Sequence, residues 1–457
     1  MGKREELGDG APRAKLRREA DGAGRDRGGR LCVGRTGAGG ENGGYLKLYL
    51  KNTPYVWYNF CCLIRGMKMV KRQIEEVFRQ EAQLYPVITL LGPRQSGKTT
   101  LSRQCFSDYS YANLEDLQSR ELAKTDARKF FSVYPPPVII DEIQRVPELA
   151  SSVQVVVDEN RDKMGQFILT GSQQPKLVET ISQSLAGRTS VLSLMPFSVR
   201  ELIDSGVSLT TDELILKGFM PDVHVRNIPP SSYYRNYFQT YVERDLRQIV
   251  NIKNINLFER FVTLLAGRIG QVVNFSALAT ETGVSSTTIN EWVSILEAAF
   301  LIFKLPPYYS NVSKRVVKSP KIYFTDVGLA AWLLGLETPQ QVSRDPLRGQ
   351  LFENMVVADI RKQMLNQGRD ARLSFLRTEK GFEVDLIISR GVYIQPIEIK
   401  SAMTYHDSFA TNLRKLMKVE KNIKSPCLVY DGDLKIALED NESEVGVCNF
   451  RKFNVGS

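Results

Sequence analysis

The sequence predicts an α/β protein built from three consecutive folded regions, and three local patterns indicate this. An apolar, β-branched run at residues 87–91 leads into a glycine-rich turn and then a helix, as buried parallel strands do. Residues 275–298 have the pattern of helix, tight turn and helix. Residues 383–400 have the pattern of two strands joined by a Ser-Arg-Gly turn, after an amphipathic helix. We expect a sheet region, a helical middle and a small α/β module, over residues 70–205, 206–345 and 346–457 respectively.

The composition is that of an ordinary globular protein, but its charge is unevenly distributed. Of the 457 residues, 42% are hydrophobic and 25% are charged. The net charge is +10, yet residues 1–66 hold 13 of the 61 Lys and Arg and 7 of the 51 Asp and Glu, so +6 of it lies there. The remainder is nearly balanced, and net charge is therefore weak support for a polyanionic partner.

Localisation and metal chemistry are constrained by what the composition lacks. The apolar runs are shorter than the roughly 20 residues that a membrane helix needs, so we expect no membrane span. The six cysteines show no metal-ligand spacing and are typical of reduced thiols in a cytoplasmic protein. With only two histidines, a multi-histidine metal site is excluded.

Residues 1–66 differ from the rest of the chain. Their first two thirds are rich in Gly, Arg and Asp and nearly lack apolar periodicity, and such a composition cannot bury enough surface to fold. A regular amphipathic pattern starts only at about residues 67–69. We expect a disordered tail or upstream sequence from a misassigned start. A basic arm that binds nucleic acid is the alternative.

A phosphate-binding loop follows the first strand. Gly92 to Thr99 match G-x-x-x-x-G-K-[ST], whose glycines let the backbone wrap phosphates while N–H groups at the helix start face the anion. We expect Lys98 to reach the β- and γ-phosphates of ATP, and the Thr99 hydroxyl to ligate Mg²⁺. The expected nucleotide-binding residues of the loop and helix start are Gly92, Pro93, Arg94, Gln95, Ser96, Gly97, Lys98, Thr99 and Thr100.

Two acids end a second apolar strand at residues 138–142. Asp141 is placed to hold magnesium through water, and Glu142 to polarise the attacking water. A buried strand that simply ends in solvated acids is the alternative. Because a kinase without hydrolytic water does not need the second acid, Glu142 favours an ATPase.

Three further polar residues are candidates for the nucleotide site. A third strand at residues 166–172 ends in Thr170 and Ser172, either of which could sense the γ-phosphate, as in P-loop ATPases with an additional strand; a Gly-Ser turn is the alternative. Arg188 follows a glycine turn. It is a candidate charge-stabilising finger, in cis or from a neighbouring subunit, or an ordinary packing arginine.

Several of these motifs together resemble one family. The motifs are Gly92-Pro93-Arg94-Gln95, Asp141-Glu142-Ile143-Gln144, Leu169-Thr170-Gly171-Ser172, and Leu185-Ala186-Gly187-Arg188 leading to Pro196-Phe197-Ser198. In these the chain resembles the prokaryotic AAA-type P-loop ATPases that carry a C-terminal domain of unknown function, over about residues 70–450. The resemblance implies ATP binding and no settled biological process.

The middle region carries an aromatic stripe and a helix-turn-helix pattern. Tyr233, Tyr237, Tyr241 and Asp245 recur at four-residue steps, which we interpret as core packing and not as a base-stacking platform. After the second helix come four basic residues and a strand, the order of a winged helix; the basic residues are Lys314, Arg315, Lys318 and Lys321. The expected recognition helix, residues 286–298, contains no Lys or Arg, so a protein contact and a DNA contact through residues 314–321 both remain open.

Four charged residues suggest a metal site in the last module. A hairpin over residues 383–400 brings Asp385 beside Glu398, where two carboxylates could bind a divalent metal and Lys400 could orient or deprotonate water. Glu353 on the preceding helix is the expected fourth member. The order resembles the PD-(D/E)XK nuclease core, although the Pro-Asp pair of that core is lacking, since Glu383-Val384 precede Asp385. A half-buried hairpin with a charged open face is the alternative.

The leading functional hypothesis is an Mg-dependent ATPase that couples its nucleotide state to a nuclease-like module acting on DNA or RNA. The alternative is a slow ATP-driven switch that binds a protein partner and whose C-terminal module is inactive. The sequence does not determine the oligomeric state.

Overall fold

The computed structural model describes residues 70–172, 180–181, 183–243, 254–309, 317–433, 436–440 and 443–456, with only the backbone for 241–243, 436–440 and 443–444. The prediction for residues 1–66 lies outside the described residues, as do Asp245, Lys314, Arg315 and the Tyr241 side chain. Among the helices of the described residues, none is both long and apolar enough to cross a membrane.

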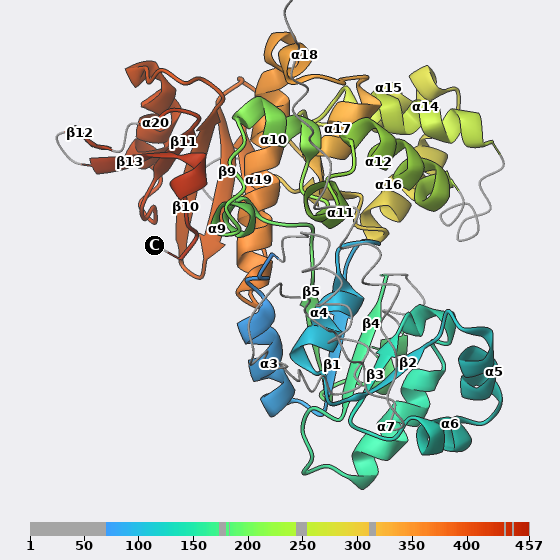
Figure 1. The fold of residues 1–457 in the computed structure, drawn as a ribbon. Helices are drawn as coiled ribbons and strands as arrows, with labels where there is room; N and C mark the ends of the chain where they lie inside the picture. Colours follow the sequence, from blue (N-terminus) through green and yellow to red (C-terminus); the bar gives the residue numbers. More distant parts are fainter. Residues whose placement is uncertain are drawn as a thin grey trace, which may run out of the picture. The chain divides into compact units, whose positions relative to one another are not determined.

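The first region is a parallel sheet with helices, as predicted. Within the described residues it has five strands, in the order β2-β3-β4-β1-β5 (Figure 1). Strand β4 therefore lies between β1, which precedes the phosphate-binding loop, and β3, which ends at Asp141. Because the paired strands are parallel, their carboxyl ends meet at one edge of the sheet. The bounds are β1 (Val87–Leu91), β2 (Ser110–Asn113), β3 (Val138–Asp141), β4 (Phe167–Gly171) and β5 (Thr189–Ser193).

Both faces of this sheet are covered, which explains its continuous apolar strands. On β1, Ile88 and Leu90 pack with Phe78 and Leu101 on one face, whereas Val87 and Leu91 belong to a core on the other face. This alternation follows from the two-residue period of a strand. The helices of the region are α3 (Glu75–Leu84), α4 (Lys98–Cys105), α5 (Leu117–Thr125), α6 (Ala127–Val133) and α7 (Leu149–Glu159).

The middle region is mainly helical and contains the predicted helix-turn-helix. Gly283 adopts a left-handed conformation (φ 83°) between the two helices, and the Ser285 hydroxyl accepts a hydrogen bond from the Thr288 N–H at 3.1 Å, which caps the second helix. A two-stranded antiparallel sheet follows. The assignment of these two helices and the sheet as a winged helix stays a prediction. The elements are α9 (Val199–Asp204), α10 (Thr211–Lys217), α11 (Pro221–Val225), α12 (Pro230–Tyr237) with a π-helical continuation (Phe238–Glu243), α14 (Ile255–Ala266), α15 (Phe275–Thr282), α16 (Ser286–Ala298), β6 (Ile302–Leu305), β7 (Lys321–Phe324), α17 (Val327–Leu333) and α18 (Pro339–Arg344).

The C-terminal module is a mixed sheet flanked by helices. Its described strands have the order β12-β13-β11-β10-β9-β8. The long helix α19 contacts β10 and, on the other side, elements of the middle region (Figure 1). The elements are α19 (Arg348–Asn366), β8 (Leu373–Arg377), β9 (Glu383–Arg390), β10 (Tyr393–Lys400), α20 (Thr411–Val419), β11 (Cys427–Tyr430), β12 (Ile436–Asp440) and β13 (Ser443–Asn449).

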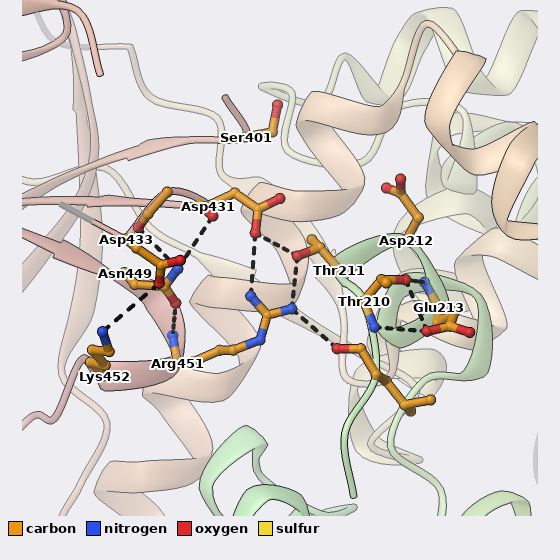
Figure 2. A network of polar contacts seen from close by, with 12 residues as sticks. Thr210, Thr211, Asp212, Glu213, Ser401, Asp431, Asp433, Asn449, Arg451 and Lys452 are labelled. Atoms are coloured by element: carbon orange, nitrogen blue, oxygen red, sulfur yellow. Dashed lines mark hydrogen bonds and ion pairs between the residues drawn. The ribbon is translucent and has the colours of Figure 1, made fainter. Parts of the chain in front are cut away.

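A buried carboxylate joins the start of α10 to this module (Figure 2). The guanidinium of Arg451 donates to the Thr211 hydroxyl at 2.9 Å and lies 3.4 Å from Asp431 Oδ1. Arg348, on α19, is 2.8 Å from Asp212 and 3.4 Å from Asp431. Because Asp431 is buried, its negative charge needs these cations, and the network ties the middle region to the C-terminal sheet.

Candidate nucleotide-binding site and C-terminal carboxylate cluster

The loop from Gly92 to Thr99 connects β1 to α4, in the position that its motif predicts. A side chain at Gly92 would place a Cβ 2.1 Å from the carbonyl oxygen of Leu194, so only glycine fits there. Gly97 is left-handed (φ 94°) and directly precedes α4, without a side chain to cap the helix. The first N–H groups of α4 are therefore suited to bind an anion.

Lys98 is buried inside this loop. Its Nζ donates to the carbonyl oxygens of Gly92 at 3.0 Å and Pro93 at 2.8 Å. Burial lowers the pKa of Lys98 to about 8, although the negative charges of Glu142 and Asp141 act in the opposite direction. The buried hydroxyl of Ser96 has no hydrogen-bond partner among the described residues. A phosphate group in the loop would supply partners to both side chains.

Asp141, at the end of β3, accepts hydrogen bonds from hydroxyl groups on three other elements. Its carboxylate accepts hydrogen bonds from Thr99 Oγ1 at 2.7 Å, from the Tyr111 hydroxyl at 2.9 Å and from the Thr170 hydroxyl. Ser172 is also buried, but no partner of its hydroxyl is found within the described residues. Of the two predicted sensor candidates, Thr170 is thus the one that contacts Asp141. A carboxylate beside a threonine hydroxyl is the oxygen-ligand chemistry that suits Mg²⁺.

Glu142 follows Asp141 in an unusual backbone conformation. Its φ is 59°, and its carboxylate accepts a hydrogen bond from the side-chain amide of Gln144. Left-handed non-glycine residues are uncommon and often occur at functional sites. Gln144 was part of the family resemblance, but its contact with Glu142 was not predicted.

Arg188 lies at the opposite edge of the sheet, which favours the alternative of a packing arginine over a finger in cis. Its carbonyl oxygen accepts a hydrogen bond from the N–H of Val87, the first residue of β1, whereas the phosphate-binding loop follows the last. Five strand residues at about 3.3 Å each separate the two ends by about 16 Å. The guanidinium binds both carboxylate oxygens of Asp158, at 2.9 and 3.0 Å. A role toward a neighbouring subunit stays a prediction.

Two residues outside the motif hold the loop in place, and sequence analysis missed their roles. Arg72 is buried and donates to the Ser96 carbonyl oxygen at 2.8 Å. The Tyr233 hydroxyl donates to Gln95 Oε1 at 2.7 Å. Tyr233 and Tyr237 are buried, as the packing interpretation predicted, but Tyr233 also connects α12 to the loop. No local pattern marks Arg72 or the polar role of Tyr233.

The C-terminal hairpin has the predicted register. Leu386 pairs with Ile397, so Asp385 lies next to Glu398. Asp385 Oδ2 accepts a hydrogen bond from the N–H of Ile399 at 2.8 Å. Lys400 Nζ is 2.7 Å from Glu398 and 3.4 Å from Asp385. Two carboxylates and one lysine therefore meet near the start of β9 and the end of β10.

The protonation of this cluster bears on the two roles predicted for Lys400. Burial acts to lower the pKa of Lys400, but the carboxylates of Asp385 and Glu398 outweigh it and raise the pKa to about 12. A lysine that keeps its proton is better suited to orient water than to deprotonate it, so this cluster favours the orienting role of the two that were predicted. Burial and the charge of Asp385 raise the pKa of Glu398 to about 8.

The predicted metal role of Glu353, Asp385 and Glu398 is not supported. The Glu353 carboxylate is bound by Lys321 Nζ at 3.0 Å and by the Tyr323 hydroxyl, both from β7. Across the part of the chain that the structure describes, no three His, Cys, Asp or Glu side chains are arranged to hold a metal ion. Each carboxylate already has a lysine partner.

Lys321 belongs to the basic stretch 314–321, for which a DNA contact was one of two open alternatives. Its side chain is buried, so this residue is not available to contact DNA.

Three family models match the chain. An AAA domain matches residues 84–203, which supports the AAA-type ATPase resemblance. A domain of unknown function (DUF8612) matches residues 209–340, and another (DUF4143) matches residues 348–450. Because the function of this last domain is unknown, the match does not confirm a nuclease-like module.

The chain is also similar to individual proteins and to solved structures. Uncharacterized proteins of Mycobacterium tuberculosis and Mycobacterium bovis are each 31% identical over 384 residues, covering 82% of this chain and 83% of theirs. A Walker-type ATPase of Pyrococcus abyssi is 15% identical with a TM-score of 0.38, covering 58% of this chain and 96% of its own. The RuvB Holliday junction branch migration motor of Thermotoga maritima is 20% identical with a TM-score of 0.27, covering 51% and 86%.

Proposed function

We infer that this chain, which belongs to the same family as the mycobacterial proteins and carries an AAA-type ATPase domain, binds ATP with Mg²⁺ and hydrolyses it. The observation that carries the proposal is the meeting of Thr99, Asp141 and Thr170 at the sheet edge that also carries Lys98. When bound, Mg²⁺ would be held by Thr99 and, through water, by Asp141, and would neutralise phosphate charge.

The other residues of this edge have distinct proposed roles. The Lys98 ammonium exchanges its carbonyl partners in the loop for phosphate oxygens of ATP. Glu142, beside Asp141, acts as the general base that polarises the attacking water. Thr170 reports on the γ-phosphate through its contact with Asp141.

Replacement of Lys98 tests the binding half of this proposal. Lys98→Ala should abolish tight ATP binding in calorimetry, because it removes the cation that faces the phosphates. Lys124→Ala is the matched control, since Lys124 lies on the surface of α5 and its side chain is 47% exposed. An unchanged affinity of Lys98→Ala would refute the nucleotide site.

We further propose that the nucleotide state is communicated to the C-terminal module. Two sets of contacts support this, and the first involves the phosphate-binding loop. Arg72 donates to the Ser96 carbonyl oxygen within the loop and to the carbonyl oxygen of Met195, two residues after β5, at 2.6 Å. The same guanidinium is 3.1 Å from Glu201 on α9. A shift of the loop on ATP binding therefore acts on residues 195–201.

The second contact joins residues 195–201 to α19. The N–H of Val199 donates to Asp359 at 2.7 Å, and Lys362 Nζ donates to the Phe197 carbonyl oxygen at 3.0 Å. Both α19 side chains are buried. Glu353 lies six residues before Asp359 on the same helix, which is about 9 Å along its axis. One rigid helix thus connects the nucleotide domain to the C-terminal cluster.

Hydrogen exchange tests this communication. A non-hydrolysable ATP analogue should increase amide protection over residues 348–366 in the wild-type protein. The effect should be lost in Asp359→Ala, which removes the contact with residue 199, and kept in Gln350→Ala on the same helix. No change in the wild type would refute the coupling while leaving ATP binding intact.

The second candidate function is a slow ATP-driven switch that binds a protein partner. It is favoured by the pairing of the C-terminal carboxylates with lysines, because that pairing leaves a metal-dependent nuclease without its ligands. Steady-state ATP hydrolysis with DNA, with RNA and with neither separates this switch from an ATPase that acts on nucleic acid. Stimulation by nucleic acid supports the ATPase that acts on nucleic acid, whereas slow turnover that neither nucleic acid changes supports the switch.

A further inference from the structure

A lysine from the middle region lies inside the C-terminal carboxylate cluster. Lys321 is the first residue of β7, and its side chain is only 1% exposed. Its Nζ is 3.0 Å from Glu353 Oε1 on α19 and 2.6 Å from Glu383 Oε1 on β9. One ammonium group thus bridges two carboxylates that belong to different elements of the module.

The position of this ammonium is built by its surroundings. The backbone of Lys321 pairs with Leu305 of β6 and also bridges to Val272. The Tyr323 hydroxyl, two residues further along β7, donates to the same oxygen of Glu353. The ring of Phe375 lies 5.4 Å from the ammonium. The lysine is therefore held by a sheet and by packing, and is not a mobile surface side chain.

The charges of the cluster are nearly balanced by cations of the chain itself. Four carboxylates belong to it, of Glu353, Glu383, Asp385 and Glu398. Lys321 forms ion pairs with Glu353 and Glu383, and Lys400 forms ion pairs with Asp385 and Glu398. Arg377 is 3.3 Å from Glu383 on the more exposed side. A divalent ion would have to enter beside the buried ammonium of Lys321 and the partly exposed ammonium of Lys400, and like charges repel strongly in a buried site.

We propose that Lys321 is the resident cation of this cluster, joining the middle region to the C-terminal module and keeping divalent metal ions out of it. The same carboxylates that suggest a nuclease in the sequence then act as a fixed ionic contact between two regions. This inference does not depend on ATP hydrolysis, since the two sites use different residues.

Manganese binding to the nucleotide-free, full-length protein tests the proposal directly. Electron paramagnetic resonance measures free Mn²⁺ in titrations of the wild type, Asp385→Asn and Asp141→Asn; the last variant identifies ions bound at the nucleotide site. We expect the wild type and Asp385→Asn to bind Mn²⁺ equally. Wild-type binding that weakens tenfold or more in Asp385→Asn would overturn the proposal.

A gain of metal binding tests the role of the lysine itself. Lys321→Met keeps an unbranched side chain one atom shorter but removes its charge, leaving Glu353 and Glu383 without their shared cation. We expect Mn²⁺ to bind this variant at least tenfold more tightly than the wild type and to raise its melting temperature. Lys304→Met is the control, since Lys304 lies on the adjacent strand β6 and pairs with Glu297 at the surface.

The remaining outcomes are also decisive. A folded Lys321→Met variant that binds Mn²⁺ no better than the wild type would overturn the assignment of Lys321 as the resident cation. If this variant does not fold, the comparison of the wild type with Asp385→Asn decides the question alone. ATP hydrolysis measured on the same wild-type preparation reports on the proposed function separately.

Discussion

The protonation of Lys98 should make ATP binding depend on pH in a defined way. Burial lowers the pKa of this lysine to about 8 in the nucleotide-free protein. Bound phosphates favour the ammonium form, so ATP raises that pKa. At pH 9 about nine-tenths of the free molecules hold a neutral Lys98 and must take up a proton to bind ATP, against about one-tenth at pH 7. ATP affinity should therefore fall about tenfold between pH 7 and pH 9.

Calorimetry in two buffers of different ionisation enthalpy measures this proton uptake. The difference in apparent binding enthalpy should correspond to nearly one proton at pH 9 and to little at pH 7. Glu398→Gln is the control, because it removes a group in the C-terminal module whose pKa also lies near 8. Equal uptake at the two pH values, or an affinity that does not change, would refute the assignment of Lys98 as a buried, phosphate-facing lysine.

Three further predictions concern the base, a buried ion pair and the N-terminal segment. Glu142→Gln should keep ATP binding but slow hydrolysis about 100-fold or more, as expected for loss of a general base, and normal turnover in a phosphate-release assay would contradict that role. Arg72→Met leaves Glu201 buried without its cation and should cost about 3–5 kcal/mol of the free energy of unfolding in urea titrations. Arg200→Met, which breaks an exposed pair, should cost less than about 1 kcal/mol, and equal losses would contradict the burial argument. Deleting residues 1–66 should leave the melting temperature and ATP hydrolysis nearly unchanged, and a drop of several degrees would show that the segment belongs to the fold.

The features that the sequence determined are those encoded by neighbouring residues. The apolar run predicts strand β1, the spacing of the glycines predicts the loop after it, and the helical pattern predicts α4. The acids at the end of β3 lie where the loop needs them, because parallel strands of one sheet end at one edge. The pairing of Asp385 with Glu398 follows from a hairpin, whose register depends on a local turn.

The tertiary structure decided which partners these residues have. The sequence left Arg188 as either a finger or a packing arginine, and strand register places it at the opposite end of the sheet, where Asp158 binds it. Arg72 pairs with Glu201, 129 residues away, and Lys321 with Glu353, 32 residues away. A lysine within a basic stretch gives no sign that the fold will bury it among carboxylates. The energy of a buried charge depends on what surrounds it in space, and for these side chains those surroundings come from distant parts of the chain.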